Sequence, residues 1–244
     1  RRHMNYTKPF KMKEFEVAHD QCAMRVNTDG CLLGALAAAS TAVTDVKRVL
    51  DIGTGSGVIA LQLAQRFPNA FVDGIEIHGP SAKQAMDNFR NSPFHSRMVC
   101  YHQPIQEFGM NTYHDIIVSN PPYFEDGPTK SDHGVAAARH ALKLDFKSLV
   151  MSVSGLLKPK GSFWAILPCD RKDRFLDAAL DVGLFLNEVI HIRPKEQREA
   201  NRCIFGLSKI NNGDALHRTI TIYEDDQSYT SETHEVLSPF YDSL

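Results

Sequence analysis

The chain has 244 residues, 43% of them hydrophobic, with 27 lysine and arginine residues against 29 aspartate and glutamate residues, a formal net charge of −2 at pH 7. A chain of this length and composition can bury a full core, and we expect one domain rather than two. The near-neutral charge excludes a global positive field, so a nucleic-acid partner would have to be held by a local basic patch.

The cysteines are odd in number, widely spaced and without a C-x-x-C pair; they are Cys22, Cys31, Cys100, Cys169 and Cys203. This pattern argues against a disulfide framework and a zinc knuckle, and it fits a reducing cytoplasm. We therefore expect a cytoplasmic protein, monomeric and without a bound metal.

The first residues, RRHM, resemble the remnant of a cleaved tag (residues 1–3) ahead of Met4, and no signal peptide follows. The longest apolar stretch, CLLGALAAASTAV at 31–43, is too short to span a bilayer and is rich in alanine. We predict that it forms a packed helix and that the protein does not enter a membrane.

From residue 47 onward, continuous apolar runs alternate with helical patterns, which is typical of a parallel sheet covered on both faces. We predict a single α/β domain with a mostly parallel, seven-stranded sheet and an antiparallel edge strand. Residues 4–46 form an N-terminal segment, 47–210 the core, and 211–244 a C-terminal strand and tail of the same domain. The expected strands are 47–52, 70–77, 97–102, 114–120, 162–167, 186–193 and 202–209, and the expected helices are 57–67, 81–91, 144–157 and 171–183.

A glycine-rich turn in VLDIGTGSGVIALQLA (49–64) places Gly53, Gly55 and Gly57 between an expected strand and an expected helix. Glycines let the backbone approach a ligand, and a helix N-terminus offers unpaired N–H groups to an anion. The dinucleotide fingerprint G-x-G-x-x-G fails, because Val58 stands at its third glycine. Asp51 ends the strand, where a carboxylate repels a pyrophosphate and attracts a ligand's ammonium group.

A second acid, Glu76, closes the next strand about 20 residues beyond the glycines, where an acid in an open α/β sheet accepts both ribose hydroxyls. Together these features predict S-adenosylmethionine as the ligand, with its ammonium near Asp51, its carboxylate near the glycine turn and its ribose on Glu76. The structural alternative is an ordinary tight turn at 53–57 with Glu76 capping a helix.

The stretch IIVSNPPYF (116–124) breaks an apolar strand at Asn120 and continues with Pro121, Pro122 and Tyr123. This N-P-P-Y motif is that of amino-group methyltransferases, which the chain resembles over most of its length, and the resemblance implies a Rossmann-like class I methyltransferase domain. An exocyclic amine delocalises its lone pair into the ring. Two acceptors on its N–H bonds, the side-chain oxygen of Asn120 and the carbonyl of Pro121, can aim that pair at a methyl carbon.

The remaining residues of the motif also suit this chemistry. The prolines hold the acceptors rigid, and Tyr123 offers a face on which an extruded base can stack. The structural alternative is a stiff loop with a buried aromatic residue.

The motif does not choose a substrate, because relatives methylate adenine N6, guanine N2 and a protein glutamine amide. Together with FKMKEFEVAHDQCAMRVNTDGCLLGALA (10–37), ANRCIFGLSK (200–209) and SPFYDSL (238–244), the motif makes the chain similar to the tRNA1(Val) (adenine-37-N6)-methyltransferase family over roughly residues 10–241. The resemblance implies S-adenosylmethionine-dependent methylation of adenine N6 in a tRNA anticodon stem-loop, with residues 4–46 as cofactor lid and substrate segment. The alternatives are an rRNA guanine-N2 or protein glutamine-amide methyltransferase, or a non-catalytic RNA-binding module.

The resemblance also implies a set of cofactor contacts. Thr28 and Asp29 would pack against the methionine end, although either residue can instead cap the following helix. Relatives have an acid after the third strand, facing the cofactor's adenine; this chain has Pro104 there, and Gln103 offers an amide instead. The expected cofactor-binding residues are Thr28, Asp29, Asp51, Gly53, Thr54, Gly55, Gly57, Glu76, Ile77, Gln103, Pro104, Ile105 and Asn120, and the expected catalytic residues are Asn120, Pro121, Pro122 and Tyr123.

A candidate RNA-binding stretch, HIRPKEQREANR (191–202), is rich in cations. We expect phosphate contacts from Arg193, Lys195, Arg198 and Arg202, extended by Lys8, Lys11 and Lys13 near the N-terminus. The alternative is a solvated loop, because glutamates are interspersed. The histidines show neither metal-ligand spacing nor pairing with a cysteine, and we interpret His78, His102 and His114, at strand ends, as structural residues.

Overall fold

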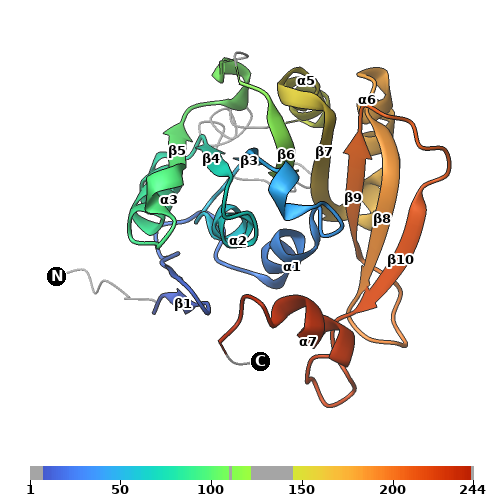
Figure 1. Cartoon of the computed structure of the whole chain (residues 1–244). Coiled ribbons are helices and arrows are strands. Elements are labelled where there is room, and N and C mark those ends of the chain that lie inside the picture. Colours follow the sequence, from blue (N-terminus) through green and yellow to red (C-terminus); the bar gives the residue numbers. More distant parts are fainter. Residues whose placement is uncertain (1–7, 110–111, 122–144, 243–244) are drawn as a thin grey trace, which may run out of the picture.

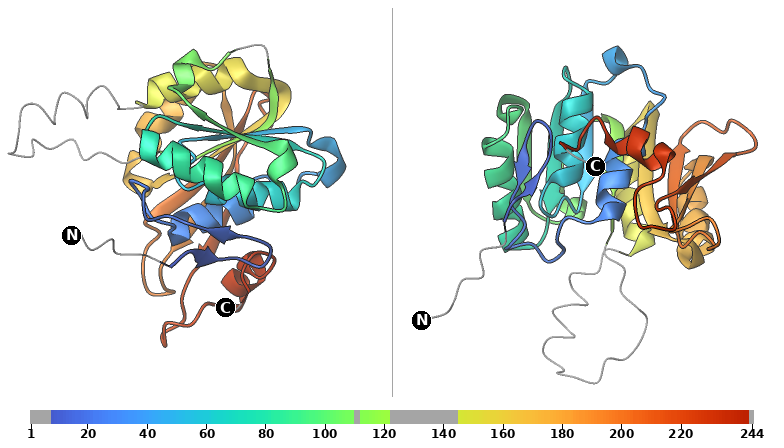
Figure 2. Two further views of the ribbon diagram at one scale, coloured as in Figure 1. Left: turned by 90° about the vertical axis from the view of Figure 1, so that its left-hand side faces the viewer. Right: turned by 90° about the horizontal axis from the view of Figure 1, so that it is seen from below.

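The structure is a computed structural model of the chain, and it describes residues 8–109, 112–121 and 145–242. The tag remnant expected at residues 1–3 lies outside these ranges. A twisted central sheet lies between two layers of helices (Figures 1 and 2). The strands of this sheet are β3 (Arg48–Ile52), β4 (Phe71–Glu76), β5 (Met98–His102), β6 (His114–Ser119), β7 (Leu157–Pro168), β8 (Phe185–Arg193), β9 (Arg202–Ser208) and β10 (Leu216–Thr221).

The described strands form one sheet in the order β10-β8-β9-β7-β6-β3-β4-β5. All neighbours pair in parallel except β9, which runs antiparallel to both β7 and β8. The carboxyl ends of β3, β4, β5 and β6 therefore meet at one edge of the sheet. Ligands of open α/β sheets bind at this edge.

The sheet differs from the sequence prediction in two details. It has eight described strands rather than seven, because the strand expected in the C-terminal region 211–244 also joins the sheet, as β10 at the edge next to β8 and parallel to it. The antiparallel strand is the internal β9 and not an edge strand. Only the short loop 194–201 separates β8 from β9, which leaves no helix for a parallel crossover, so the chain reverses directly and β9 inserts between β8 and β7.

Helices cover both faces of the sheet. Helices α1 (Thr28–Leu36), α2 (Val58–Arg66) and α3 (Gly79–Arg90) pack on one face, and α5 (Phe146–Leu156) and α6 (Lys172–Asp181) pack on the other. Side chains of β3 alternate between the two cores: Val49 belongs to the first, and Leu50 and Ile52 belong to the second. No helix in the described ranges is long and apolar enough to cross a membrane.

Helix α1 begins and ends earlier than the apolar stretch 31–43 suggested. It begins at Thr28 because the Asn27 side chain accepts a hydrogen bond from the amide of Gly30 at 2.9 Å. It ends at Leu36, and Ala38 has a positive φ of 53°. The guanidinium of Arg66, in the last turn of α2, donates to carbonyl oxygens at the end of α1. These hydrogen bonds join the C-terminal ends of the two helices.

The segment before α1 runs along α3. After a short hairpin of β1 (Phe10–Lys11) and β2 (Glu16–Val17), backbone amides of residues 18–23 donate to side chains on one stripe of α3. Asn88 accepts from the Ala18 amide at 3.0 Å, Gln84 from the Gln21 amide at 2.8 Å, and Ser81 from the Ala23 amide at 3.2 Å. This contact carries residues 24–27 to the ligand-binding edge of the sheet.

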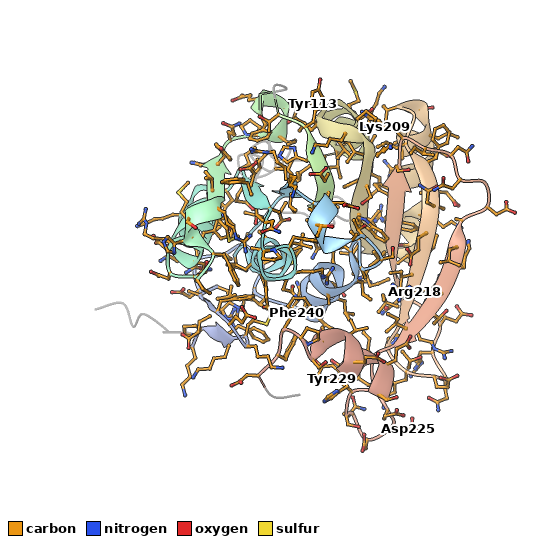
Figure 3. All side chains as sticks on the ribbon, in the orientation of Figure 1. Tyr113, Lys209, Arg218, Asp225, Tyr229 and Phe240 are labelled. Carbon is orange, nitrogen blue, oxygen red and sulfur yellow. The ribbon has the colours of Figure 1, made fainter. Side chains whose placement is uncertain are left out.

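The C-terminal residues close the face formed by α1 and α2. Beyond β10, helix α7 (Ser231–Leu237) packs against α1, with Thr230 as its N-cap. The ring of Phe240 lies 5.6 Å from the Arg66 guanidinium, and Figure 3 shows Phe240 below α1 and α2. Leu237 and Phe240 belong to the same core cluster as residues of α1 and α2.

Candidate active site

A cavity of about 540 Å³ opens at the carboxyl edge of the sheet. Its walls come from parts of the chain that are far apart in sequence: residues 23–27 with Gly30, residues 52–56 with Val58 and Ile59, residues 75–77 with Ser81, residues 103–106, and Asn120. Gly57, expected among the cofactor-binding residues, is not part of this lining. Such a cavity has the size of a small-molecule site.

The glycine turn forms the floor of the cavity. Gly53, Gly55 and Gly57 all have positive φ angles, of 72°, 56° and 84°. The amides of Gly53 and Thr54 donate to the carbonyl of Ile75 at 2.8 and 3.0 Å, which ties the turn to β4. A Cβ on Gly53 would meet no atom within 4 Å, so the backbone at this position borders open space. The turn therefore allows a ligand to approach the main chain directly.

Glu76 lies at the end of β4 and lines the cavity beside the turn. Its carboxylate accepts the amide of Gly55 at 2.9 Å through Oε2 and the amide of His78 at 2.8 Å through Oε1. Each oxygen keeps a second lone pair for a further donor. The alternative interpretation was that Glu76 caps a helix. The N-cap of α3 is instead the His78 side chain, and Glu76 only accepts the backbone amide of His78.

Asp51 does not line the cavity but lies beneath it, fully buried. Its Oδ2 accepts the hydroxyl of Thr54 at 2.7 Å, and Thr54 lines the cavity. Burial raises the pKa of Asp51 to about 7, with the Thr54 hydrogen bond acting in the opposite direction. Its Oδ1 has no hydrogen-bond partner among the described residues. The expected contact with a ligand's ammonium stays a prediction.

One end of the cavity has mostly apolar walls. Ile77, Pro104 and Ile105 line it, together with the side-chain amides of Gln103 and Gln106. Pro104 introduces the short 3-10 helix η3 (Ile105–Glu107), so the chain turns immediately after β5. Apolar surface with amide groups suits a purine ring, and among the described residues no carboxylate stands on this wall.

Asn120 follows β6 directly and lines the cavity. The hydroxyl of Ser119 donates to the carbonyl of Ile52 at 2.9 Å, which fixes the end of β6 to the end of β3. Pro121 is buried next to it. Pro122 and Tyr123 lie outside the described residues, so their roles stay predictions.

Comparisons with known proteins identify the family. The model of the methyltransferase small domain family matches residues 30–167. A tRNA1(Val) (adenine(37)-N6)-methyltransferase of Pedobacter heparinus is 40% identical over 232 residues, covering 95% of this chain and 97% of that relative. The protein of the same name in Aeromonas hydrophila subsp. hydrophila is 39% identical over 237 residues, covering 95% of this chain and 96% of that relative. The chain belongs to this tRNA1(Val) (adenine(37)-N6)-methyltransferase family.

Solved structures agree on the fold of this methyltransferase. A crystal structure described as a predicted O-methyltransferase from Agrobacterium tumefaciens has a TM-score of 0.67 at 19% identity, covering 86% of this chain and 96% of that one. A putative RNA methyltransferase from Pyrococcus horikoshii has a TM-score of 0.51 at 16% identity, covering 79% and 88%. The prediction of a Rossmann-like α/β methyltransferase domain is confirmed.

As a member of this family the protein is an enzyme that uses S-adenosylmethionine, and the cavity fits that cofactor. Open space above Gly53 leaves room for a ligand on the backbone, and the Glu76 carboxylate has free lone pairs for hydroxyl groups. The apolar wall at Ile77 and Pro104 suits an adenine ring. These residues would hold the cofactor, and its methylsulfonium group would supply an electrophilic methyl.

The entrance to α1 in this methyltransferase differs from the expectation. Thr28 and Asp29 do not line the cavity, whereas their neighbours Asn27 and Gly30 do. The helix cap is Asn27, so the idea that Thr28 or Asp29 serves as the cap is wrong. Asp29 instead accepts a 2.9 Å hydrogen bond from Nε of Arg202 and holds α1 to β9. The helix already begins at Thr28, so the capping residue is the one before it, Asn27.

The sequence interpretation assigned residues 4–46 to a cofactor lid and substrate segment but named none of the wall residues 23–27. Arg25 is exposed on this wall and contributes a cationic side chain to it. Among the described residues, Arg25 and Glu76 are the charged residues that line the cavity. The stripe of Ser81, Gln84 and Asn88 at helical spacing was the available signal, because a polar stripe on a core helix predicts a bound partner segment.

The expected RNA-binding cations of this methyltransferase mostly have partners within the fold. Arg193 donates to Thr221 and Glu196, Lys195 donates to the carbonyl of Asp225, and Arg202 binds Asp29. Lys11 lies 3.9 Å from Glu16, and Lys13 donates to the carbonyl of Ser238. Arg198 and Lys8 are exposed. These side chains brace loops, and their contact with RNA stays a prediction.

Proposed function

We propose that the protein methylates N6 of adenine 37 in a valine tRNA. The observation that carries this proposal is Asn120, which ends β6 at the wall of the cofactor cavity and begins the N-P-P-Y motif. Relatives named tRNA1(Val) (adenine(37)-N6)-methyltransferase match 95% of the chain and support the choice of substrate. In this proposal the enzyme acts as a cytoplasmic monomer on the anticodon stem-loop, without a metal.

Asn120 and Pro121 carry the chemistry in this proposal. The side-chain oxygen of Asn120 accepts one N–H of the adenine amino group, and the Pro121 carbonyl accepts the other. Both interactions strengthen as positive charge develops on the nitrogen, so they lower the barrier rather than merely bind the base. No strongly basic side chain is needed for this role.

Substrate pools test the reaction directly. The enzyme with isotopically labelled S-adenosylmethionine is offered separate pools of tRNA, rRNA, DNA and release factor, and the labelled nucleoside is identified by mass spectrometry after digestion. We expect label in tRNA, as N6-methyladenosine at position 37. Label only in rRNA as a guanine derivative, or only in protein, would overturn the proposal in favour of the corresponding alternative.

The role of Asn120 has its own test. Asn120→Ala should lower kcat by about two orders of magnitude, the scale of losing one oriented transition-state hydrogen bond. Asn69→Ala is the matched control, because Asn69 is exposed at the opposite end of β4. Circular dichroism should be the same for both variants. Unchanged turnover in Asn120→Ala would mean that the amine is held by other groups.

A further inference from the structure

Two thiols and two imidazoles form a cluster on the β8–β9 side of the sheet, apart from the cofactor cavity. Cys169 begins the 3-10 turn η4 (Cys169–Arg171) directly after β7, and Cys203 is the second residue of β9. Their sulfurs are 2.6 Å apart. Sγ of Cys203 lies 3.6 Å from Nδ1 of His191, and Nε2 of His191 lies 3.2 Å from Nδ1 of His217.

The distance between the sulfurs decides between two kinds of site. Two thiolates on a tetrahedral zinc ion, with Zn–S bonds of about 2.3 Å, would lie roughly 3.8 Å apart. The sulfurs here are much closer, and among the described residues no group of three or more ligating side chains is placed to hold a metal. A covalent S–S bond of about 2.05 Å needs an approach of only about half an ångström. The geometry therefore favours a disulfide.

The two thiols differ in access to reagents. Cys169 is half-buried, whereas Cys203 is 1% exposed within the core. A small reagent from solution must therefore meet Cys169 first. Burial raises the pKa of the Cys203 thiol to about 12, so Cys203 needs a base before it can act as a nucleophile.

His191 lies where such a base is needed. Burial, followed by the nearby His217 and Lys172, lowers the pKa of His191 and keeps the imidazole neutral. When Nε2 of His191 donates to His217, Nδ1 carries a lone pair facing the Cys203 sulfur. The positive charge of Lys172 also favours a thiolate at Cys203.

We propose that Cys169 and Cys203 form a reversible disulfide by exchange with a low-molecular-weight disulfide, with His191 as the base for Cys203. Cys169 loses its proton to water and its thiolate attacks one sulfur of the reagent; the reagent S–S bond breaks, and the first reagent thiolate leaves and takes up a proton from water. Cys203 then passes its proton to His191 and attacks the Cys169 sulfur, and the second reagent thiolate leaves and takes up that proton. Two protein thiols are oxidised by two electrons, and one reagent disulfide is reduced to two thiols.

The test is a thiol–disulfide titration of the full chain. Reduced protein is equilibrated with oxidised and reduced glutathione at graded ratios, quenched with N-ethylmaleimide in denaturant so that buried thiols also react, and analysed by intact mass and peptide mapping. We expect the number of alkylated cysteines to fall from five to three, with one cross-linked peptide pair that contains Cys169 and Cys203. Reduction with dithiothreitol should restore all five. A different pair, or glutathione adducts that never resolve into a cross-link, would overturn the proposal.

Variants separate the steps. Cys169→Ser should abolish the cross-link, whereas Cys22→Ser, a half-buried cysteine beside α3, should leave it unchanged. His191→Gln should let the glutathione adduct on Cys169 accumulate and slow its resolution by about 100-fold, the low end of general-base effects. Resolution at the wild-type rate in His191→Gln would remove His191 from the mechanism. The wild-type peptide map needs no variant, so it decides on the disulfide even if a variant folds poorly.

Discussion

At the scale of single residues, Glu76 combines structure and binding in one carboxylate. It accepts the amides of Gly55 and His78, and so it shapes the glycine turn that it lies beside. We therefore expect Glu76 to affect the cofactor in two ways. Its own lone pairs are available to the ligand, and its hydrogen bonds fix the backbone of the glycine turn. The same carboxylate that we expect to bind the ribose also holds the turn at the floor of the cavity.

Glu76→Gln should weaken S-adenosylmethionine binding by about 10- to 100-fold, because the amide NH2 cannot accept the second backbone hydrogen bond and one charge-assisted bond is lost. Isothermal titration calorimetry measures the dissociation constant without turnover. Glu107→Gln is the control, because Glu107 is exposed in η3 outside the cavity lining. Equal affinities for the two variants would exclude Glu76 from the cofactor site.

Arg25 is one of the residues that only the structure placed at the cavity. We expect its guanidinium to meet the cofactor's carboxylate, so Arg25→Gln should weaken S-adenosylmethionine binding by about fivefold, as for a partly exposed ion pair. Binding of 5′-methylthioadenosine, which lacks the carboxylate, should not change. Calorimetry with both ligands checks this, and an equal loss for both would contradict a carboxylate contact.

At the scale of elements, the glycine turn joins three parts of the fold. Gly57 precedes α2 with a φ of 84°, and a Cβ at this position would overlap the ring of Phe89 in α3. The close approach of the turn to α3 therefore requires glycine for two reasons, the backbone conformation and the space. Both effects would lower the free energy of unfolding if Gly57 were replaced.

Gly57→Ala should lower the free energy of unfolding by about 2–4 kcal/mol, from left-handed backbone strain and overpacking against Phe89 together. Gly213→Ala separates the two causes, because Gly213 has a similar φ of 87° but no atom within 4 Å of an added Cβ. Its cost should be about 1 kcal/mol. Urea denaturation measures both, and equal losses would show that the contact with Phe89 contributes nothing.

The elements that were predicted correctly from the sequence are those specified by a pattern of neighbouring residues. Continuous apolar runs gave β3, β4 and β6 nearly to the residue, and the glycines, Glu76 and Asn120 were found because each stands next to a strand end. The position of β9 inside the sheet was not predictable, since it depends on pairing between distant strands. The wall at residues 23–27 was missed for the same reason: it exists only when the segment docks on α3.

At the scale of the whole molecule, one buried carboxyl group couples stability to pH. Burial raises the pKa of Asp51 from 3.8 to about 7, so the native state binds more protons than the unfolded chain between these values. Its contribution is present at low pH and is lost as the pH rises through about 7. In the cofactor-free enzyme, the contribution of Asp51 to the free energy of unfolding therefore falls as the pH rises towards neutrality.

The free energy of unfolding of the cofactor-free enzyme should fall by about 2 kcal/mol between pH 5.5 and 8 relative to Asp51→Asn, which cannot titrate. Urea denaturation of both proteins at the two pH values gives this difference. Parallel pH profiles would show that Asp51 ionises with an ordinary pKa in the native state.

The polar stripe on α3 determines how the cofactor cavity can open. Residues 18–23 are held to the helix by side-chain acceptors at Ser81, Gln84 and Asn88 and not by pairing with the central sheet. Detaching this strap breaks a few such bonds and leaves every central-sheet ladder intact. Displacing this segment would therefore alter one wall of the cavity without touching the strand ends that carry Glu76 and Asn120.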